Sequence, residues 1–287
     1  MGDALFPFQT SLNASTLFPY KLDIREQLRV AAEAGYDGIE IWMRDLEAYA
    51  ASGGSIAELK DYAASLGIAI PNAIAFFRWA DMSETARHDG FAQAEREMRM
   101  LAELGCPAVA APPYGDVDGA GPEHFAAHFA ELVRLGRSMG VEPYLEFWGR
   151  AKRLNRLEDA ASVLDLSGIG DAKLLLDPFH MYVGGSRFES VGTLSGDRIG
   201  IVHANDYPAE PPRETIADRD RVFPGEGIAP LGRLARLLCD SGYGGYLSLE
   251  LFIENFGGRT APDTARYGLD CLRKAFSVDH IEGARST

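Results

Sequence analysis

Four residues that can bind a cation or carry a proton each close a short apolar run. The runs read YLE, LLLD, IGIVH and YLSLE, and their last residues are Glu146, Asp177, His203 and Glu250. Continuous apolar runs of this length are typical of parallel strands buried on both faces. We therefore expect these four groups to stand at the carboxyl ends of four strands.

Three carboxylates and one imidazole form a mostly hard ligand set. Oxygen donors favour Mg²⁺ or Mn²⁺, and the single histidine also admits Co²⁺, Zn²⁺ or Fe²⁺. Without a cation, carboxylates packed this closely would repel one another and at least one would protonate. Each residue taken alone is more often solvated surface or a satisfied core group, but their recurrence at four successive strand ends favours a divalent-metal site.

The intervening segments predict an alternation of helices and strands. Asp23 is a plausible N-cap and Gly35 a C-terminal glycine of the first helix. Expected helices lie at 22–35, 55–67, 84–105, 122–140, 157–166, 228–241 and 264–276, with a further segment at 187–194, and expected strands lie at 6–15, 38–42, 68–76, 107–111 and 142–147 and begin near Leu174, Ile199 and Tyr246.

Eight such pairs without a composition break predict an α/β fold, a single-domain (β/α)8 TIM barrel over residues 1–287. A doubly wound open sheet is the alternative, but it gives no reason for four strand ends to converge. Active sites of such barrels lie at the carboxyl ends of the strands. The long segment 206–227 after the seventh strand would leave that same end, and loops of this length are usually functional or disordered.

Aromatic residues follow several of the expected strands. They can form an apolar wall against a bound ligand or simply pack under the loops, and the sequence does not separate these two interpretations. The residues are Trp42, Phe76, Phe77, Trp79, Tyr114 and Trp148.

Bulk properties exclude several classes of function. The 42 acidic and 28 basic residues give a net charge of −14, which repels nucleic acid phosphate. There is no membrane-length apolar run and no basic-then-apolar leader in the first thirty residues, so we expect a cytoplasmic protein without a membrane partner. Three cysteines without CxxC spacing predict free thiols.

The order of these motifs resembles the xylose isomerase-like TIM-barrel superfamily, and within it the sugar phosphate isomerase/epimerase group. The resemblance extends from Phe8 to about Phe276 and is more specific for the superfamily than for a substrate. The motifs are YLEFWGR around Glu146, LDPFH with Asp177 and His180, VHANDYP around His203, PGEG at 224–227, and LSLELF around Glu250.

The resemblance implies a metal-dependent isomerase or epimerase of carbohydrate metabolism, acting on a small sugar or polyol. One divalent ion, with Mn²⁺ favoured over Mg²⁺, Co²⁺ or Zn²⁺, would be held by Glu146, Asp177, His203 and Glu250. His180 and Arg221 would bind substrate. Glu146 and Glu250 would act as base and acid on either side of an enediolate. Returning the proton to the opposite face gives epimerisation, and returning it to the adjacent carbon gives isomerisation.

Two departures limit the resemblance. Ketose 3-epimerases usually carry a glutamate where this chain has Lys152, which speaks against a close ketose 3-epimerase. The expected second and third strands lack the histidines that the endonuclease branch of the superfamily needs to bind zinc, which, with the acidic net charge, speaks against a role in DNA repair. Other functions stay open. One alternative is a dehydratase of the inosose or dehydroshikimate type on the same metal site. Another is a binding barrel without turnover. The sequence leaves open whether the chain forms a homo-oligomer.

Overall fold

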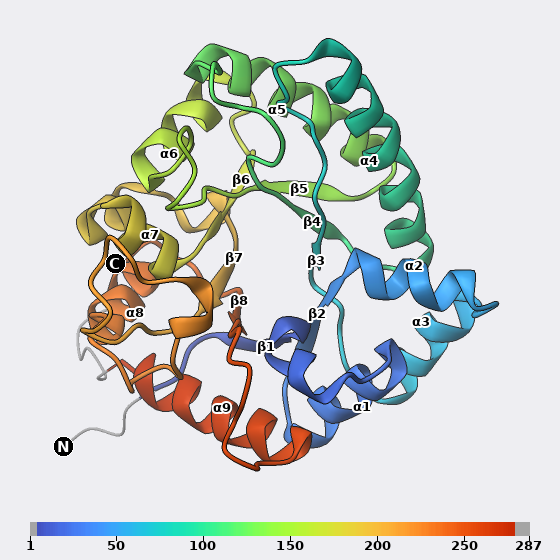
Figure 1. Ribbon diagram of the computed structural model, residues 1–287, viewed down its shortest axis with the longest axis vertical. Helices are drawn as coiled ribbons and strands as arrows, with labels where there is room; N and C mark the ends of the chain where they lie inside the picture. Colours follow the sequence, from blue (N-terminus) through green and yellow to red (C-terminus); the bar gives the residue numbers. More distant parts are fainter. Residues whose placement is uncertain (1–4, 279–287) are drawn as a thin grey trace, which may run out of the picture.

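The chain forms a closed barrel of eight parallel strands in sequence order, in which β8 pairs with β1 (Figure 1). The computed structural model describes residues 5–278. The predicted (β/α)8 barrel is therefore confirmed. The strands are β1 Gln9–Asn13, β2 Gly38–Trp42, β3 Ala73–Ile74, β4 Ala108–Ala111, β5 Glu142–Leu145, β6 Lys173–Leu176, β7 Ile199–Ala204 and β8 Tyr246–Leu249.

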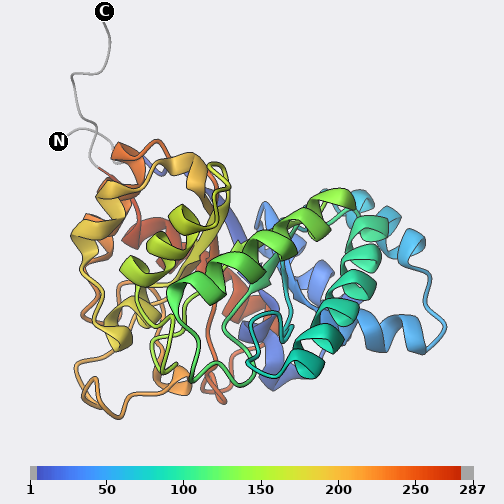
Figure 2. The same ribbon diagram turned by 90° about the horizontal axis from the view of Figure 1, so that it is seen from above.

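Helices form a ring around the strands and run alongside them (Figures 1 and 2). The first begins as predicted, because Asp23 and Glu26 form a capping box, and it ends at Gly35 in the left-handed conformation, with φ 92°. The helices are α1 Ile24–Ala34, α2 Met43–Ala51, α3 Ile56–Ser65, α4 Glu84–Leu104, α5 Pro122–Ser138, α6 Leu157–Leu166, α7 Pro178–Gly184, α8 Leu231–Asp240 and α9 Ala261–Ala275, with 3-10 turns at Ala14–Tyr20, Phe188–Thr193, Gly196–Arg198 and Asp218–Asp220.

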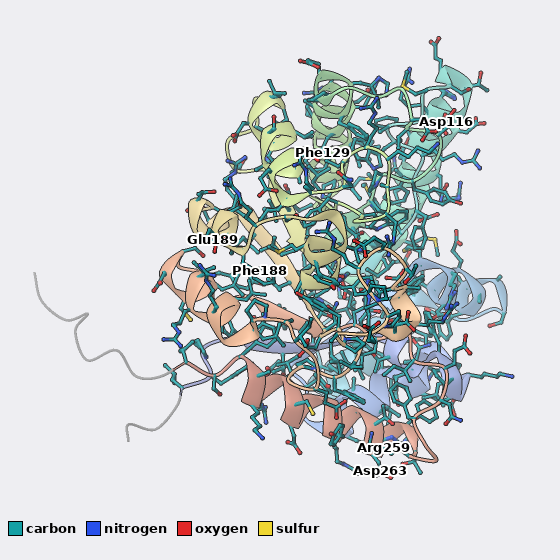
Figure 3. The ribbon with its side chains drawn as sticks, turned by 60° about the vertical axis from the view of Figure 1, so that its left-hand side comes forward. Asp116, Phe129, Phe188, Glu189, Arg259 and Asp263 are labelled. Atoms are coloured by element: carbon teal, nitrogen blue, oxygen red, sulfur yellow. The ribbon has the colours of Figure 1, made fainter. Side chains whose placement is uncertain are left out.

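Strand residues alternate between two buried environments. In β2, Ile39 and Ile41 pack in the large core between barrel and helices, whereas Trp42 packs with the residues inside the barrel. Phe129 of α5 is fully buried in the outer core, while Arg259 and Asp263 near the start of α9 lie at the outer edge of the molecule (Figure 3). Both faces of the strands are therefore covered, as their apolar sequences predict.

Three elements show the main differences from the sequence prediction. Strand β3 is shorter than the predicted 68–76, because Pro71 has no N–H to donate to the ladder. Helix α7 begins at Pro178, where only the end of a strand was expected; Asp177 caps it by accepting hydrogen bonds from the backbone of Phe179 and His180. Helix α2, which follows β2 without a spacer, was not predicted.

Two bulk expectations can be compared with the described residues. Between residues 5 and 278, no helix combines the length and the apolar composition needed to cross a membrane. Cys106, Cys239 and Cys271 are free thiols, as predicted.

Candidate metal centre

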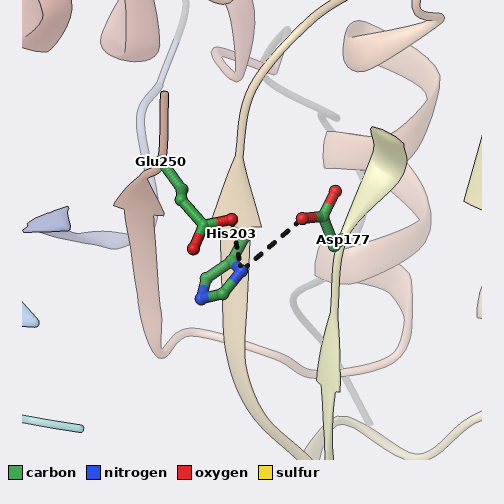
Figure 4. A group of neighbouring side chains, drawn as sticks. All are labelled: Asp177, His203 and Glu250. Atoms are coloured by element: carbon green, nitrogen blue, oxygen red, sulfur yellow. Dashed lines mark ion pairs between the residues drawn. The ribbon is translucent and has the colours of Figure 1, made fainter. Parts of the chain in front are cut away.

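Three of the predicted ligands converge at the ends of adjacent strands. Asp177 directly follows β6, His203 lies in β7 and Glu250 directly follows β8. One ligand atom from each lies within 4.8 Å of the others, and all three side chains are buried. Figure 4 shows them meeting from neighbouring strands. Strands that are far apart in the sequence thus bring two carboxylates and an imidazole to one point.

The ring of His203 is oriented by groups on both sides. Its Nε2 lies 3.2 Å from Oε1 of Glu40. Its Nδ1 lies 3.0 Å from Oε2 of Glu250 and 3.5 Å from Oδ2 of Asp177. Burial lowers the pKa of His203, but the carboxylates of Glu250 and Glu40 outweigh it, so this pKa lies well above its ordinary value. The imidazole therefore stands in a strongly negative field.

Arg221 reaches the same two carboxylates from the loop after β7. Its Nη1 donates to Oδ2 of Asp177 at 2.8 Å and to Oε2 of Glu250 at 2.7 Å. Its Nη2 donates to Asp218 at 2.6 Å, and its guanidinium lies 4.5 Å from the ring centre of Phe179. Burial raises the pKa of Asp177, but the charge of Arg221 outweighs it and holds this pKa well below the ordinary range.

The loop 206–227 is held to the barrel by Asp206. The backbone of Asp206 pairs with that of Val222, next to Arg221. The Asp206 carboxylate accepts hydrogen bonds from the backbone N–H groups of Tyr207, Gly225, Gly227 and Ala229. This anchoring explains the PGEG turn and fixes where Arg221 enters the site. In Figure 2 the loop is orange and projects from one end of the barrel.

Glu146 and His180 lie beside this cluster. Oε1 of Glu146 is 4.0 Å from Nε2 of His180, which is 3.5 Å from Nη2 of Arg221. Burial raises the pKa of Glu146 to about 8, with the carboxylates of Glu250 and Asp177 adding to the effect and His203 opposing it. Burial also lowers the pKa of His180. Glu146 is not among the residues whose ligand atoms lie within 4.8 Å of one another.

A cavity of about 670 Å³ opens above these residues, and its lining includes Glu146, His180, Arg221 and Glu250. Trp42, Phe76 and Trp148 of the predicted aromatic wall also line it, together with Phe252.

The other three predicted aromatics do not line this cavity. Phe77 and Trp79 are fully buried in the core, where Trp79 also donates a hydrogen bond to the carbonyl of Pro112. Tyr114 is partly exposed and packs against Phe76. The wall interpretation is therefore wrong for Phe77 and Trp79, which are packing residues.

The sequence pattern did not predict the cluster of polar residues inside the barrel. Glu40 of β2 is fully buried and contacts His203, and it binds the side chains of Asn13, Asn72 and Ser248. The signal available was a charged residue within the apolar strand GIEIW. A carboxylate inside a strand that is buried on both faces must be paired or carry out chemistry.

The three converging residues fit a divalent cation. Two carboxylates and one imidazole suit Mg²⁺, Mn²⁺ or Zn²⁺. The contact of His203 Nδ1 with Glu250 lacks hydrogen-bond geometry, and within residues 5–278 this buried nitrogen has no hydrogen-bond partner. A buried nitrogen aimed at two carboxylates without a bond of its own is what a ligand atom of a metal site would show.

Known proteins are similar over most of the chain. An inosose isomerase of Bacillus velezensis is 28% identical over 251 residues, which cover 85% of this chain and 89% of that protein. A 3-dehydroshikimate dehydratase of Pseudomonas aeruginosa is 30% identical over 264 residues, which cover 88% of this chain but 39% of that protein. The crystal structure of the IOLI protein with a binding zinc atom shares the fold with a TM-score of 0.86 at 24% identity, over 94% of this chain and 98% of that one.

The named relatives are enzymes of the isomerase, epimerase and dehydratase types. The family model described as xylose isomerase-like TIM barrel matches residues 28–275. The chain therefore belongs to the xylose isomerase-like TIM-barrel family.

Proposed function

We propose that this protein is a divalent-metal-dependent isomerase or epimerase that moves a proton next to the carbonyl of a small sugar or polyol. The observation that carries the proposal is the convergence of Asp177, His203 and Glu250 within 4.8 Å, with Glu146 and Glu250 lining one cavity. A cation site that opens into a cavity of this size is suited to a small polyhydroxylated ligand.

In this proposal Asp177, His203 and Glu250 hold the ion, and Glu146 is the fourth ligand. A divalent cation there would polarise the substrate carbonyl and stabilise negative charge on its oxygen. Mn²⁺ is our first choice, and the zinc atom in the IOLI protein structure makes Zn²⁺ the first alternative to test. Mg²⁺ and Co²⁺ complete the panel.

The two glutamates of the cavity carry the proton. Glu250 is already bound by Arg221 through one oxygen and by Asn13 through the other. Glu146 stands at a different strand end, after β5, beside His180. Glu146 therefore removes the proton from one side of the substrate carbon, and Glu250 returns it from the other. A positioned acid or base of this kind contributes about 10²–10⁴-fold to the rate.

His180 and Arg221 hold the substrate. Both line the cavity next to Glu146. The imidazole of His180 can bind a substrate hydroxyl, and its lowered pKa favours the neutral ring, which both accepts and donates a hydrogen bond. The guanidinium of Arg221 lines the cavity and balances the charge of Asp177, Glu250 and Asp218.

A dehydratase is the second candidate, favoured by the similarity to 3-dehydroshikimate dehydratases of Pseudomonas aeruginosa and Pseudomonas putida. The chain spans only 39% of the length of those proteins. In this alternative the same proton removal is followed by loss of a β-hydroxyl group as water.

One experiment separates these functions. The Mn²⁺-loaded protein is incubated in D₂O with a ketose panel, with inosose and with 3-dehydroshikimate. Deuterium that enters the substrate without loss of water supports the isomerase or epimerase, whereas a new enone absorbance supports the dehydratase. If no substrate exchanges a proton and metal removal changes no ligand affinity, the protein is a binding barrel and the proposal fails.

A further inference from the structure

A buried carboxylate stands directly beneath the candidate metal centre. Glu40 lies in β2, inside the barrel, and is 0% exposed. Its Oε1 contacts Nδ2 of Asn72 at 2.6 Å and Nε2 of His203 at 3.2 Å. Its Oε2 accepts from Nδ2 of Asn13 at 2.7 Å and from Oγ of Ser248 at 2.7 Å. Each carboxylate oxygen thus has two polar neighbours.

This environment keeps Glu40 ionised. Asn13, Asn72 and Ser248 each donate a hydrogen bond to its carboxylate, and such donors favour the ionised form. The two amide nitrogens and the hydroxyl are supplied by three other strand ends or loops, so the carboxylate is fixed from several sides. An ionised carboxylate is a hydrogen-bond acceptor only.

A hydrogen-bond acceptor next to Nε2 of His203 determines whether Nδ1 of the neutral ring carries a proton. Because Glu40 can only accept, Nε2 of His203 must carry a proton to bond with it. In the neutral ring, Nδ1 then carries a lone pair that points toward Asp177 and Glu250. Among the described residues, this nitrogen has no hydrogen-bond partner. With no acceptor at Nε2, the imidazole would be free to take the other tautomer and to turn.

We infer that Glu40 is a positioning residue: it holds His203 with Nε2 protonated and Nδ1 as the metal ligand. The inference rests on the metal site of the proposed function and adds a residue to which neither the family motifs nor the converging ligand set assigns a role. A carboxylate behind a metal-binding histidine fixes the ring orientation and raises its basicity, and loss of such a partner typically costs 10–100-fold in metal affinity.

The first test measures Zn²⁺ affinity by competition with a chromophoric chelator. Glu40→Gln removes the charge at nearly constant shape and should weaken Zn²⁺ binding about 10–100-fold. Ser248→Ala is the matched control, because it removes a donor to the other oxygen of Glu40 and leaves the contact with His203 in place. Its Zn²⁺ affinity should stay close to that of the wild type. Zn²⁺ binding by Glu40→Gln as tight as in the wild type overturns the inference.

A second test needs no variant and covers the case in which Glu40→Gln does not fold. ¹⁵N NMR of the wild-type protein loaded with diamagnetic Zn²⁺ shows which nitrogen of His203 carries the proton. We expect a slowly exchanging proton on Nε2 and a metal-bound Nδ1. A proton on Nδ1, or coordination through Nε2, overturns the inference.

These results are distinguishable from failure of the proposed function. A wild-type protein that binds Zn²⁺ through Nδ1 but exchanges no substrate proton contradicts the proposed reaction and leaves the role of Glu40 intact. If the wild type exchanges substrate protons normally but Glu40→Gln binds Zn²⁺ as tightly as the wild type, the proposed reaction stands and the role of Glu40 is contradicted. A wild-type protein that binds no divalent ion overturns both.

Discussion

Arg221 is bonded to Glu250 through a 2.7 Å contact between Nη1 and Oε2, and both side chains are buried. The same Nη1 also bonds Asp177, so one guanidinium compensates two carboxylates of the candidate metal centre. Removing one member of a buried ion pair costs about 3–5 kcal/mol, because it leaves an uncompensated buried charge.

The first prediction concerns Arg221→Met. The metal-free variant should lose about 3–5 kcal/mol of unfolding free energy in urea denaturation. Saturating Mn²⁺ should restore part of this loss, because a cation bound to Asp177 and Glu250 supplies the missing positive charge. Arg221→Lys is the control: it keeps the charge but lacks the planar fork that reaches three carboxylates at once. Equal stability of Arg221→Met and the wild type without metal would contradict this account.

The second prediction concerns the proton-carrying glutamates. Glu146→Gln and Glu250→Gln should both fold and both lose exchange of substrate protons, by about 10²-fold or more. Glu250→Gln should weaken Mn²⁺ binding more than Glu146→Gln does, because Oε2 of Glu250 lies 3.0 Å from Nδ1 of His203 whereas Glu146, the proposed fourth ligand, is outside the converging group. Solvent-deuterium exchange followed by ¹H NMR measures the first effect, and calorimetric titration with Mn²⁺ the second. Near-normal turnover in either variant removes that residue from the mechanism.

Much of the site followed from the sequence because its pattern is local. Asp177, His203 and Glu250 each end an apolar run, and the closure of a parallel barrel brings the carboxyl ends of its strands together. The position of α7 did not follow, because Asp177 serves both as a strand-end carboxylate and as a helix cap. The apolar run before Asp177 predicted only the end of a strand and did not indicate the helix that Asp177 caps.

Other parts of the fold and the candidate site depend on contacts between residues that are far apart in the sequence, which a local pattern does not predict. The inward direction of Glu40 is set by the register of β2 between β1 and β3, and its partners come from distant segments. The role of Arg221 came from the family resemblance alone, and its pairing with Asp218 depends on how Asp206 folds the loop. Phe77 and Trp79 follow a strand end, as Phe76 does, but point into the core.

The third prediction concerns the aromatic side of the cavity. Trp148 lines the cavity and packs against Phe76, with 6.0 Å between ring centres. Trp148→Ala should raise KM for a sugar substrate more than it lowers kcat, because an apolar ring surface binds substrate and transition state alike. Trp148→Phe keeps a ring and should stay closer to the wild type. Steady-state kinetics measure both constants, and a fall in kcat at unchanged KM would show instead that Trp148 acts in the chemical step.

The last prediction concerns pH and stability at a position away from the candidate metal centre. Glu97 of α4 is buried; its Oε1 accepts from Gln93 at 2.7 Å, and its Oε2 has no hydrogen-bond partner in the described part of the chain. Burial raises the pKa of Glu97 from 4.5 to about 7, and the carboxylate of Glu47 adds to the effect while Gln93 and Arg96 oppose it. The folded protein therefore binds a proton at Glu97 more tightly than the unfolded chain does.

Between pH 4.5 and about 7 the folded state thus holds the extra proton, and the contribution of Glu97 to stability falls as the pH rises through this window. Glu97→Gln removes the titration. The unfolding free energy of Glu97→Gln minus that of the wild type should be nearly constant below pH 4.5. It should rise between pH 4.5 and about 7 and level off at higher pH. The rise is at most about 3.5 kcal/mol, from about 1.4 kcal/mol for each unit of the difference between 4.5 and about 7. Urea denaturation at a series of pH values measures the difference, and Glu95→Gln, on the exposed side of the same helix, tests whether losing any carboxylate from α4 has this effect. A difference that stays flat across the window would show that Glu97 is already ionised in the folded protein at no cost.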